Sequence, residues 1–138
     1  MVFALGNPLR GDDGAGPAAV SGLDLGAAQV VVAHQLLPEH ADLLAGATLA
    51  VFVDAREGGA AGALLDEEVV PGGDAPLSHH FAPGHLLALA RALHGRAPRA
   101  LALSVSGADF GHGERLSREV NGALLALRER LRGVVGVV

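Results

Sequence analysis

Short, uninterrupted apolar runs constrain the fold of this chain more than any other feature of its sequence. Such runs occupy Val2–Leu5, Val30–Ala33 and residues 48–53, and a glycine or polar residue follows each one. Strands buried on both faces of a parallel sheet have this continuous apolar character, whereas half-exposed strands alternate apolar and polar residues. The intervening stretches can carry helices at residues 17–25 and 38–44. The pattern therefore predicts βαβ units around a parallel sheet.

The second half of the chain predicts one strand of opposite direction. Only about eight residues separate Asp54 from the next strand-like run, at residues 63–70, whereas a parallel crossover needs about a dozen. We therefore expect that strand to run antiparallel. A helix at Pro83–His94, a strand at residues 99–105 and a final helix capped by Ser117 complete the order. The final helix has a predicted core-facing stripe at spacings of four and three residues, made of Leu116, Val120, Leu124, Leu127 and Leu131.

Composition excludes several classes of protein. The 138 residues, half of them apolar, suffice for one domain over residues 1–138 with its own core. The absence of Cys excludes thiolate metal sites, cysteine nucleophiles and disulfides. The net charge of -5 and the absence of Trp and Tyr argue against a nucleic-acid groove. No apolar run reaches the ~20 residues of a membrane span, and the first residues lack an export-signal pattern. We therefore expect a cytoplasmic protein that binds neither membranes nor nucleic acid.

Acidic and imidazole side chains are concentrated in three segments. Asp12 and Asp13 follow the first strand, Asp54 follows the strongest one, and His79 and His80 precede a helix. In open α/β sheets, ligands bind in the crevice outside the carboxyl ends of the strands, so these segments should meet there. Two carboxylates and one imidazole leave coordination positions open, and nickel or zinc would suit such a set.

Each of these residues also has a structural interpretation. One acid of the opening pair can cap the following helix, and we expect Asp12 to be that cap. Asp54 at the tip of a buried strand favours function, because perturbed carboxylates gather at functional sites. The other histidines are expected to be solvated or capping residues, with His112 in a loop at the same edge: His34, His40, His85, His94 and His112.

Other catalytic motifs are absent. The segment GDDGAG lacks the glycine spacing of a dinucleotide-binding fingerprint, and a chain without Lys has no phosphate-binding P-loop. There is no GxSxG elbow, and none of the five serines has an evident base in the sequence. Hydrolysis in this chain would therefore use a water activated by a carboxylate or by a metal ion.

The opening segment Gly6 to Gly16, GNPLRGDDGAG, resembles the signature of the hydrogenase maturation endopeptidases, which trim the large subunit of nickel-iron hydrogenases. Four later segments are similar to further blocks of that family in the same order. They are HQLLPE at 34–39, VDAR at 53–56, SHHFAP at 78–83 and GHGERLS at 111–117. The resemblance thus spans nearly the whole chain.

The resemblance implies an α/β three-layer sandwich: a twisted five-stranded mixed sheet, mostly parallel with one antiparallel strand, flanked by helices. It implies that Asp13, Asp54 and His79 contact the metal and carry catalysis, with His80 as the alternative imidazole. Residues 34–39 are expected to line the peptide groove.

The substrate implied is a hydrogenase large-subunit precursor that brings its own nickel, so no tightly held cofactor is expected. Two alternatives use the same side chains. One is a chaperone that binds a nickel-bearing client without cutting it, and the other is a small-molecule metallohydrolase.

Overall fold

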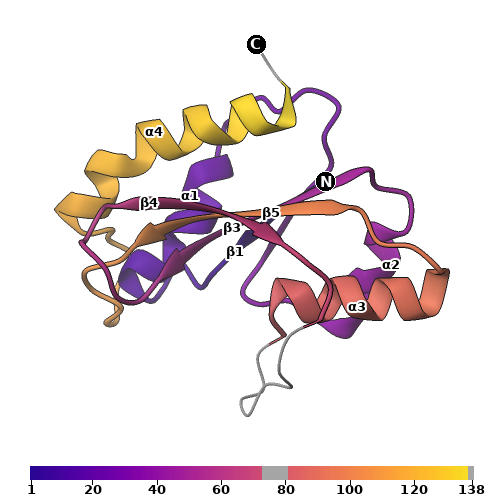
Figure 1. Cartoon of the computed structure of the whole chain (residues 1–138). Helices are drawn as coiled ribbons and strands as arrows, with labels where there is room; N and C mark the ends of the chain where they lie inside the picture. The colour runs from indigo at the N-terminus through magenta and orange to yellow at the C-terminus, as the bar shows by residue number, and fades with distance from the viewer. Residues whose placement is uncertain (73–80, 137–138) are drawn as a thin grey trace.

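The computed structural model describes residues 1–72 and 81–136, which form one five-stranded sheet with helices on both faces (Figure 1). The strand order is β2-β1-β3-β5-β4. Four strands are parallel, and β4 is antiparallel to its neighbour β5. The bounds of the strands are β1 Val2–Leu5, β2 Val30–Ala33, β3 Leu49–Arg56, β4 Leu64–Val69 and β5 Arg99–Ser106. The predicted α/β class, with one antiparallel strand in a mixed sheet, is confirmed.

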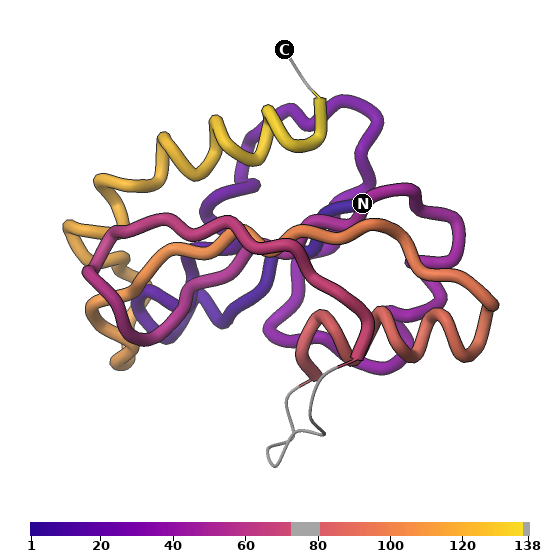
Figure 2. Tube along the Cα trace, viewed as in Figure 1, coloured from indigo at the N-terminus to yellow at the C-terminus, as the bar shows by residue number. Residues whose placement is uncertain are grey.

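The helices form two layers, which the Cα trace separates clearly (Figure 2). On one face lie α1 (Ala15–Val20) and α4 (Arg118–Val135). On the other lie α2 (Ala41–Leu44), which continues from the 3₁₀ turn η2 (Pro38–His40), and α3 (Pro83–His94).

Two apolar cores lie between these layers because side chains alternate along each strand. In β1, Val2 and Ala4 pack toward α1 and α4, whereas Phe3 packs toward α2 and α3. Phe3 stacks on Phe52 of β3 with ring centroids 5.1 Å apart. Burial on both faces explains why β1 and residues 50–53 of β3 have no polar side chains, whereas the edge strand β4 carries Asp66, Glu67 and Glu68.

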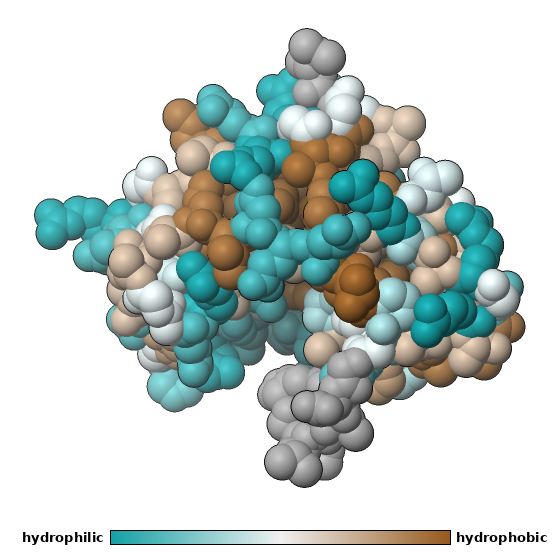
Figure 3. All heavy atoms as spheres, in the orientation of Figure 1, coloured by the Kyte–Doolittle hydropathy of each residue, from teal (hydrophilic) through white to brown (hydrophobic). Residues whose placement is uncertain are grey.

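The last helix follows the expected pattern. The Ser117 hydroxyl accepts a hydrogen bond from the Val120 N–H at 3.2 Å, so Ser117 caps α4 as predicted. Val120, Leu127 and Leu131 are fully buried, and Leu116 and Leu124 pack partly buried against the same core. In the orientation of Figure 1, hydrophilic and apolar side chains mix over α4 and β4 (Figure 3), and an ion pair between Arg130 and Asp66 joins the two elements.

Two expected elements differ from the observed ones by more than one residue at an end. The helix expected at residues 17–25 is the shorter α1, which the 3₁₀ turn η1 (Gly11–Gly14) precedes. The strand expected at 48–53 extends to Arg56, because β5 continues to pair with β3 through Asp54 and Arg56. The antiparallel strand β4 pairs with β5, which follows it in the sequence. Among the described residues, no helix is both long and apolar enough to cross a membrane.

Candidate functional site

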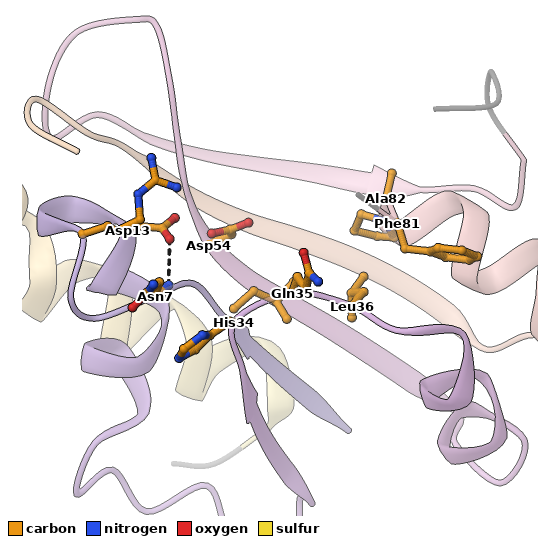
Figure 4. Close-up of a pocket in the computed structure, with 11 residues that line it drawn as sticks. Asn7, Asp13, His34, Gln35, Leu36, Asp54, Phe81 and Ala82 are labelled. Atoms are coloured by element: carbon orange, nitrogen blue, oxygen red, sulfur yellow. Dashed lines mark hydrogen bonds between the residues drawn. The ribbon is translucent and has the colours of Figure 1, made fainter. Parts of the chain in front are cut away.

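A cavity of about 600 Å³, here called the main cavity, opens where β1, β2 and β3 end (Figure 4). Its walls come from the segments after these three strands and from the start of α3. The polar lining residues are Asn7, Arg10, Asp13, His34, Gln35 and Asp54. The apolar ones are Leu5, Leu36, Phe81, Ala82 and Pro83. The cavity thus occupies the crevice that an α/β sheet offers to ligands.

Asp13 lies in η1, and the turn after β1 fixes its carboxylate. The Asn7 N–H donates a hydrogen bond to Oδ2 of Asp13 at 2.7 Å, as Figure 4 shows. Gly6 makes this approach possible, because a Cβ at that position would lie 1.8 Å from the Asp13 carbonyl oxygen. Gly6 and the backbone N–H of Asn7 therefore orient Asp13, whereas the Asn7 side chain accepts from the Leu9 N–H within the turn.

Asp54 projects from β3 toward the carboxylate of Asp13 (Figure 4). Its Oδ1 accepts a hydrogen bond from the Ala55 N–H at 2.8 Å. Burial raises the pKa of Asp54 to about 7; the Ala55 N–H opposes this rise and the charge of Asp13 adds to it. The two predicted acids therefore meet at one cavity. Binding a proton there compensates the free-energy cost of burying the negative charge of Asp54.

Asp12 does not cap the helix that follows it, so that prediction is wrong. Its carboxylate is fully buried and faces the segment between β5 and α4. It accepts hydrogen bonds from the N–H groups of Ala108, Asp109 and Ser117 at 2.7, 3.0 and 2.6 Å. Burial alone raises the pKa of this carboxyl, but the three donors outweigh burial and hold its pKa below the ordinary value. Asp12 thus ties η1 to the segment between β5 and α4.

His79 and His80 lie outside the described residues, so the third predicted ligand stays a prediction. Phe81 and Ala82, the next residues along the chain, line the main cavity. Within residues 1–72 and 81–136, no group of three or more His, Asp or Glu side chains is placed to hold a metal ion.

The remaining histidines cap helices or are exposed, and Nε2 of the exposed His94 also lies 2.9 Å from Oδ1 of Asp42. Nδ1 of His40 accepts from the Leu37 N–H at 2.9 Å, and Nδ1 of His85 accepts from the Ala82 N–H at 3.2 Å. Both are the capping residues expected. His34 is exposed but lines the main cavity, as do Gln35 and Leu36 of the expected peptide groove; residues 37–39 do not. His112 is exposed and does not line the main cavity.

Two residues of the cavity wall were not predicted to be functional. Asn7 contributes its backbone N–H to Asp13, and Arg10 brings a cation to the wall. Both belong to the opening segment, which is the signal that could have marked them. Their roles depend on the path of the turn after β1, which the sequence does not show.

Solved structures of other proteins share the fold of this chain. No protein-family model matches the chain, and no curated protein matches its sequence significantly. Among solved structures, it is similar to the NiFe hydrogenase maturation protease HybD from Thermococcus kodakarensis, with 22% identity, 97% of each chain covered and a TM-score of 0.75.

Two further solved structures have the same arrangement. The hydrogenase maturating endopeptidase HybD from E. coli is 16% identical, with 98% of this chain and 90% of that chain covered and a TM-score of 0.76. The hydrogenase 2 maturation peptidase from a Thaumarchaeota archaeon is 20% identical, with 99% of this chain and 97% of that chain covered and a TM-score of 0.69. The chain therefore has the fold of the hydrogenase maturation proteases, and the resemblance seen in its opening segment is confirmed at the level of the fold.

Proposed function

We propose that this chain is a cytoplasmic endopeptidase that removes the C-terminal extension of a nickel-loaded NiFe hydrogenase large-subunit precursor. The observation that carries the proposal is the convergence of Asp13 and Asp54 on one open cavity. The fold supports it, because solved proteins that share it over nearly their whole length are named as maturation proteases. The resemblance of the opening segment points to the same substrate.

The chemistry starts with the ion that the precursor carries. Carboxylate oxygens and an imidazole nitrogen suit nickel, so Asp13 and Asp54 would orient the ion, with His79 as third ligand or proton carrier. Asp54 is protonated for part of the time near neutral pH because its pKa is about 7, and a bound cation would displace that proton. A site of this kind holds a free ion weakly and gains affinity when a precursor presents the ion.

Hydrolysis then needs a water molecule placed against the scissile carbonyl. The ion can polarise the carbonyl and lower the pKa of the water, and a carboxylate can accept its proton. His34, Gln35 and Leu36 on one side and Phe81 on the other border the main cavity, which leaves room for an extended peptide between them. Cutting one bond there would release a C-terminal tail.

The decisive experiment compares nickel-loaded with nickel-free precursor as the substrate of the full-length protein. The variants are Asp13→Asn, Asp54→Asn and His79→Ala, and the readout is the intact mass of the precursor. Asp24→Asn is the matched control, because Asp24 is exposed and accepts only a local turn hydrogen bond from the Gly26 N–H. We expect the wild type and Asp24→Asn to cut only the nickel-loaded precursor, and the three site variants to lose at least about 100-fold in rate.

Equal cutting of both precursors, or undiminished cutting by all three variants, would contradict the proposal. Stable binding of the nickel-loaded precursor with no change in its mass would instead establish a non-cleaving chaperone. A purified protein that retains its own metal tightly and hydrolyses small substrates would be a metallohydrolase.

A further inference from the structure

The two edge strands of the sheet, β2 and β4, differ in how they are protected from further pairing. The β4 edge carries Asp66, Glu67 and Glu68, all exposed, and such charges keep an edge from adding another strand. The β2 edge has the sequence VVVA and carries no charge. Val30 is 38% and Val32 is 59% exposed, so apolar side chains stand open at this edge. β2 is therefore the edge at which a further strand can pair.

The outward backbone groups of β2 belong to Val30 and Val32. The carbonyl oxygens of Gln29 and Ala33 accept hydrogen bonds from the β1 segment, at 2.8 and 3.0 Å. Because the backbone groups of successive residues point to alternate sides of a strand, those of Val30 and Val32 point away from β1. Within residues 1–72 and 81–136, β2 pairs with β1 alone, so no strand lies opposite these outward groups. Their N–H and C=O groups are open to an extended chain.

β2 leads directly into the main cavity. His34, Gln35 and Leu36 follow the strand and form one wall of that cavity (Figure 4). At the ordinary strand spacing of about 4.8 Å, a chain paired with the outer edge of β2 would lie about 14 Å from β3, which carries Asp54. About four or five extended residues span that distance. One extended peptide can therefore reach both Asp54 and the outer edge of β2.

The size and the position of this edge favour a substrate peptide over a second copy of the chain. The four residues of β2 extend over only about 13 Å. Pairing two such edges covers far less than the roughly 1,200 Å² of a stable interface. A peptide needs less from the edge, because the adjoining main cavity binds it as well. Strand addition of this kind uses main-chain hydrogen bonds, which a peptide offers whatever its side chains are.

We propose that the substrate adds as a strand to the outer edge of β2, through the main-chain groups of Val30 and Val32, at an extended segment adjoining the one in the main cavity. This inference rests on the proposed function, because it assigns a docking edge to the same peptide-cutting centre. The exposed side chains of the two valines contact alternate side chains of the added strand. β2 positions the peptide and takes no part in bond cleavage.

The first test removes one outward N–H group. Val32→Pro deletes the donor that faces away from β1, and an edge strand tolerates proline where the missing N–H faces outward. Val32→Ala is the matched control, because it also shortens the side chain but keeps the N–H. On the nickel-loaded precursor, Val32→Pro should raise KM about fivefold with kcat within about twofold of wild type. Val32→Ala should raise KM less than about twofold. Melting temperatures show whether both variants fold.

The second test leaves the enzyme unchanged and alters the substrate. Residues of the nickel-loaded precursor are replaced singly by Pro or by Ala, over about eight positions on each side of the scissile bond. On one side, beyond the residues held in the main cavity, Pro should raise KM at alternate positions, because every second N–H of an added strand faces β2. Ala at the same positions should leave KM within about twofold of the unmodified precursor.

Equal KM values for folded Val32→Pro and Val32→Ala, or a Pro scan without alternation, would overturn the inference. A wild-type dimer that Val32→Pro dissociates, measured by light scattering, would also overturn it, since the edge would then pair with a second copy. A precursor that binds the wild type without being cut would count against the proposed function alone. In that case, the Kd values of labelled precursor for the two variants decide the docking edge by the same fivefold difference, about 1 kcal/mol. A precursor that neither binds nor is cut would overturn both.

Discussion

Asp12 and Asp54 show that burial alone does not set the charge of an aspartate. Asp12 is fully buried yet accepts three backbone hydrogen bonds, and its pKa is lowered. Asp54 accepts one such bond and faces Asp13, and its pKa rises to about 7. The number of donors around each carboxylate decides the direction. Asp12 therefore stabilises the fold as an anion, whereas Asp54 as an anion destabilises it.

The first prediction concerns Asp54→Asn and pH. The folded protein binds a proton at Asp54 up to about pH 7, whereas an unfolded Asp releases it near 3.9. The free energy of unfolding of the wild type therefore decreases between about pH 4 and pH 7 through this group. Relative to wild type, Asp54→Asn should gain about 3 kcal/mol in going from pH 4.5 to pH 8. Urea unfolding followed by circular dichroism measures this, and parallel pH profiles of the two proteins would contradict it.

The second prediction concerns Asp12→Asn. The amide offers one acceptor oxygen, and its NH₂ group faces backbone N–H donors, so we expect a loss of about 3 kcal/mol at pH 7. Because the pKa of Asp12 is lowered, the loss should shrink as the pH falls below about 4 and the wild-type carboxyl takes up a proton. The same unfolding experiments measure it. A loss that is equal at pH 3 and pH 7 would show that the charge of Asp12 is irrelevant.

At the scale of elements, a glycine allows α1 to lie close to the sheet. A Cβ on Gly16 would lie 2.3 Å from the carbonyl oxygen of Leu5 and 2.7 Å from that of Val53. These carbonyls belong to β1 and β3, whose ends carry the site. The second glycine of the segment GAG is therefore what lets η1 and Asp13 lie beside Asp54.

The third prediction compares two Gly→Ala changes within helices. Gly16→Ala should lower the free energy of unfolding by about 1–3 kcal/mol, since α1 must move off the sheet, and the movement should lower proteolytic activity as well. Gly122→Ala in α4, where a Cβ would meet nothing within 4 Å, should raise stability by up to about 1 kcal/mol. Thermal and urea unfolding measure both. A Gly16→Ala protein that is at least as stable as the wild type would contradict the close contact between α1 and the sheet.

Helix ends that are set by nearby residues could be predicted from the sequence. For α3, Pro83 starts the helix and Gly95, at φ +78°, ends it, so the expected and observed bounds agree. The extension of β3 beyond Asp54 and the pairing of β4 with β5 depend on partners distant in sequence. Asp54 was predictable because it directly follows the apolar run 48–53, and Asp13 because it belongs to the opening segment that carries the family resemblance. The contacts of Asp12 were not predictable, because its donors lie about a hundred residues away.

At the scale of the whole molecule, one sheet is shared by two cores. Alternate residues of β3 serve both, with Val51 and Val53 toward α1 and α4, and Ala50 and Phe52 toward α2 and α3. Loss of either layer would expose one face of the same strand. We therefore expect the layers to unfold together.

The fourth prediction tests this coupling with one variant in each core. Leu131→Ala, in α4, and Leu87→Ala, in α3, each remove a fully buried side chain, and each should lower the free energy of unfolding by about 2–5 kcal/mol. Both variants should still unfold in a single transition, and the slope of the free energy of unfolding against urea concentration should stay as in the wild type. Two separate transitions in either variant, seen by circular dichroism, would show that the layers unfold independently.

The long reach of Asp12 has a consequence for biosynthesis. Its hydrogen-bond donors belong to residues 108, 109 and 117, so about a hundred amino acids of translation separate the carboxylate from its partners. A nascent polypeptide that stops short of Ala108 contains both acids of the opening pair but leaves Asp12 without these donors. The ribosome must therefore deliver the last quarter of the chain before these hydrogen bonds can form, so η1 reaches its final arrangement only near the end of synthesis.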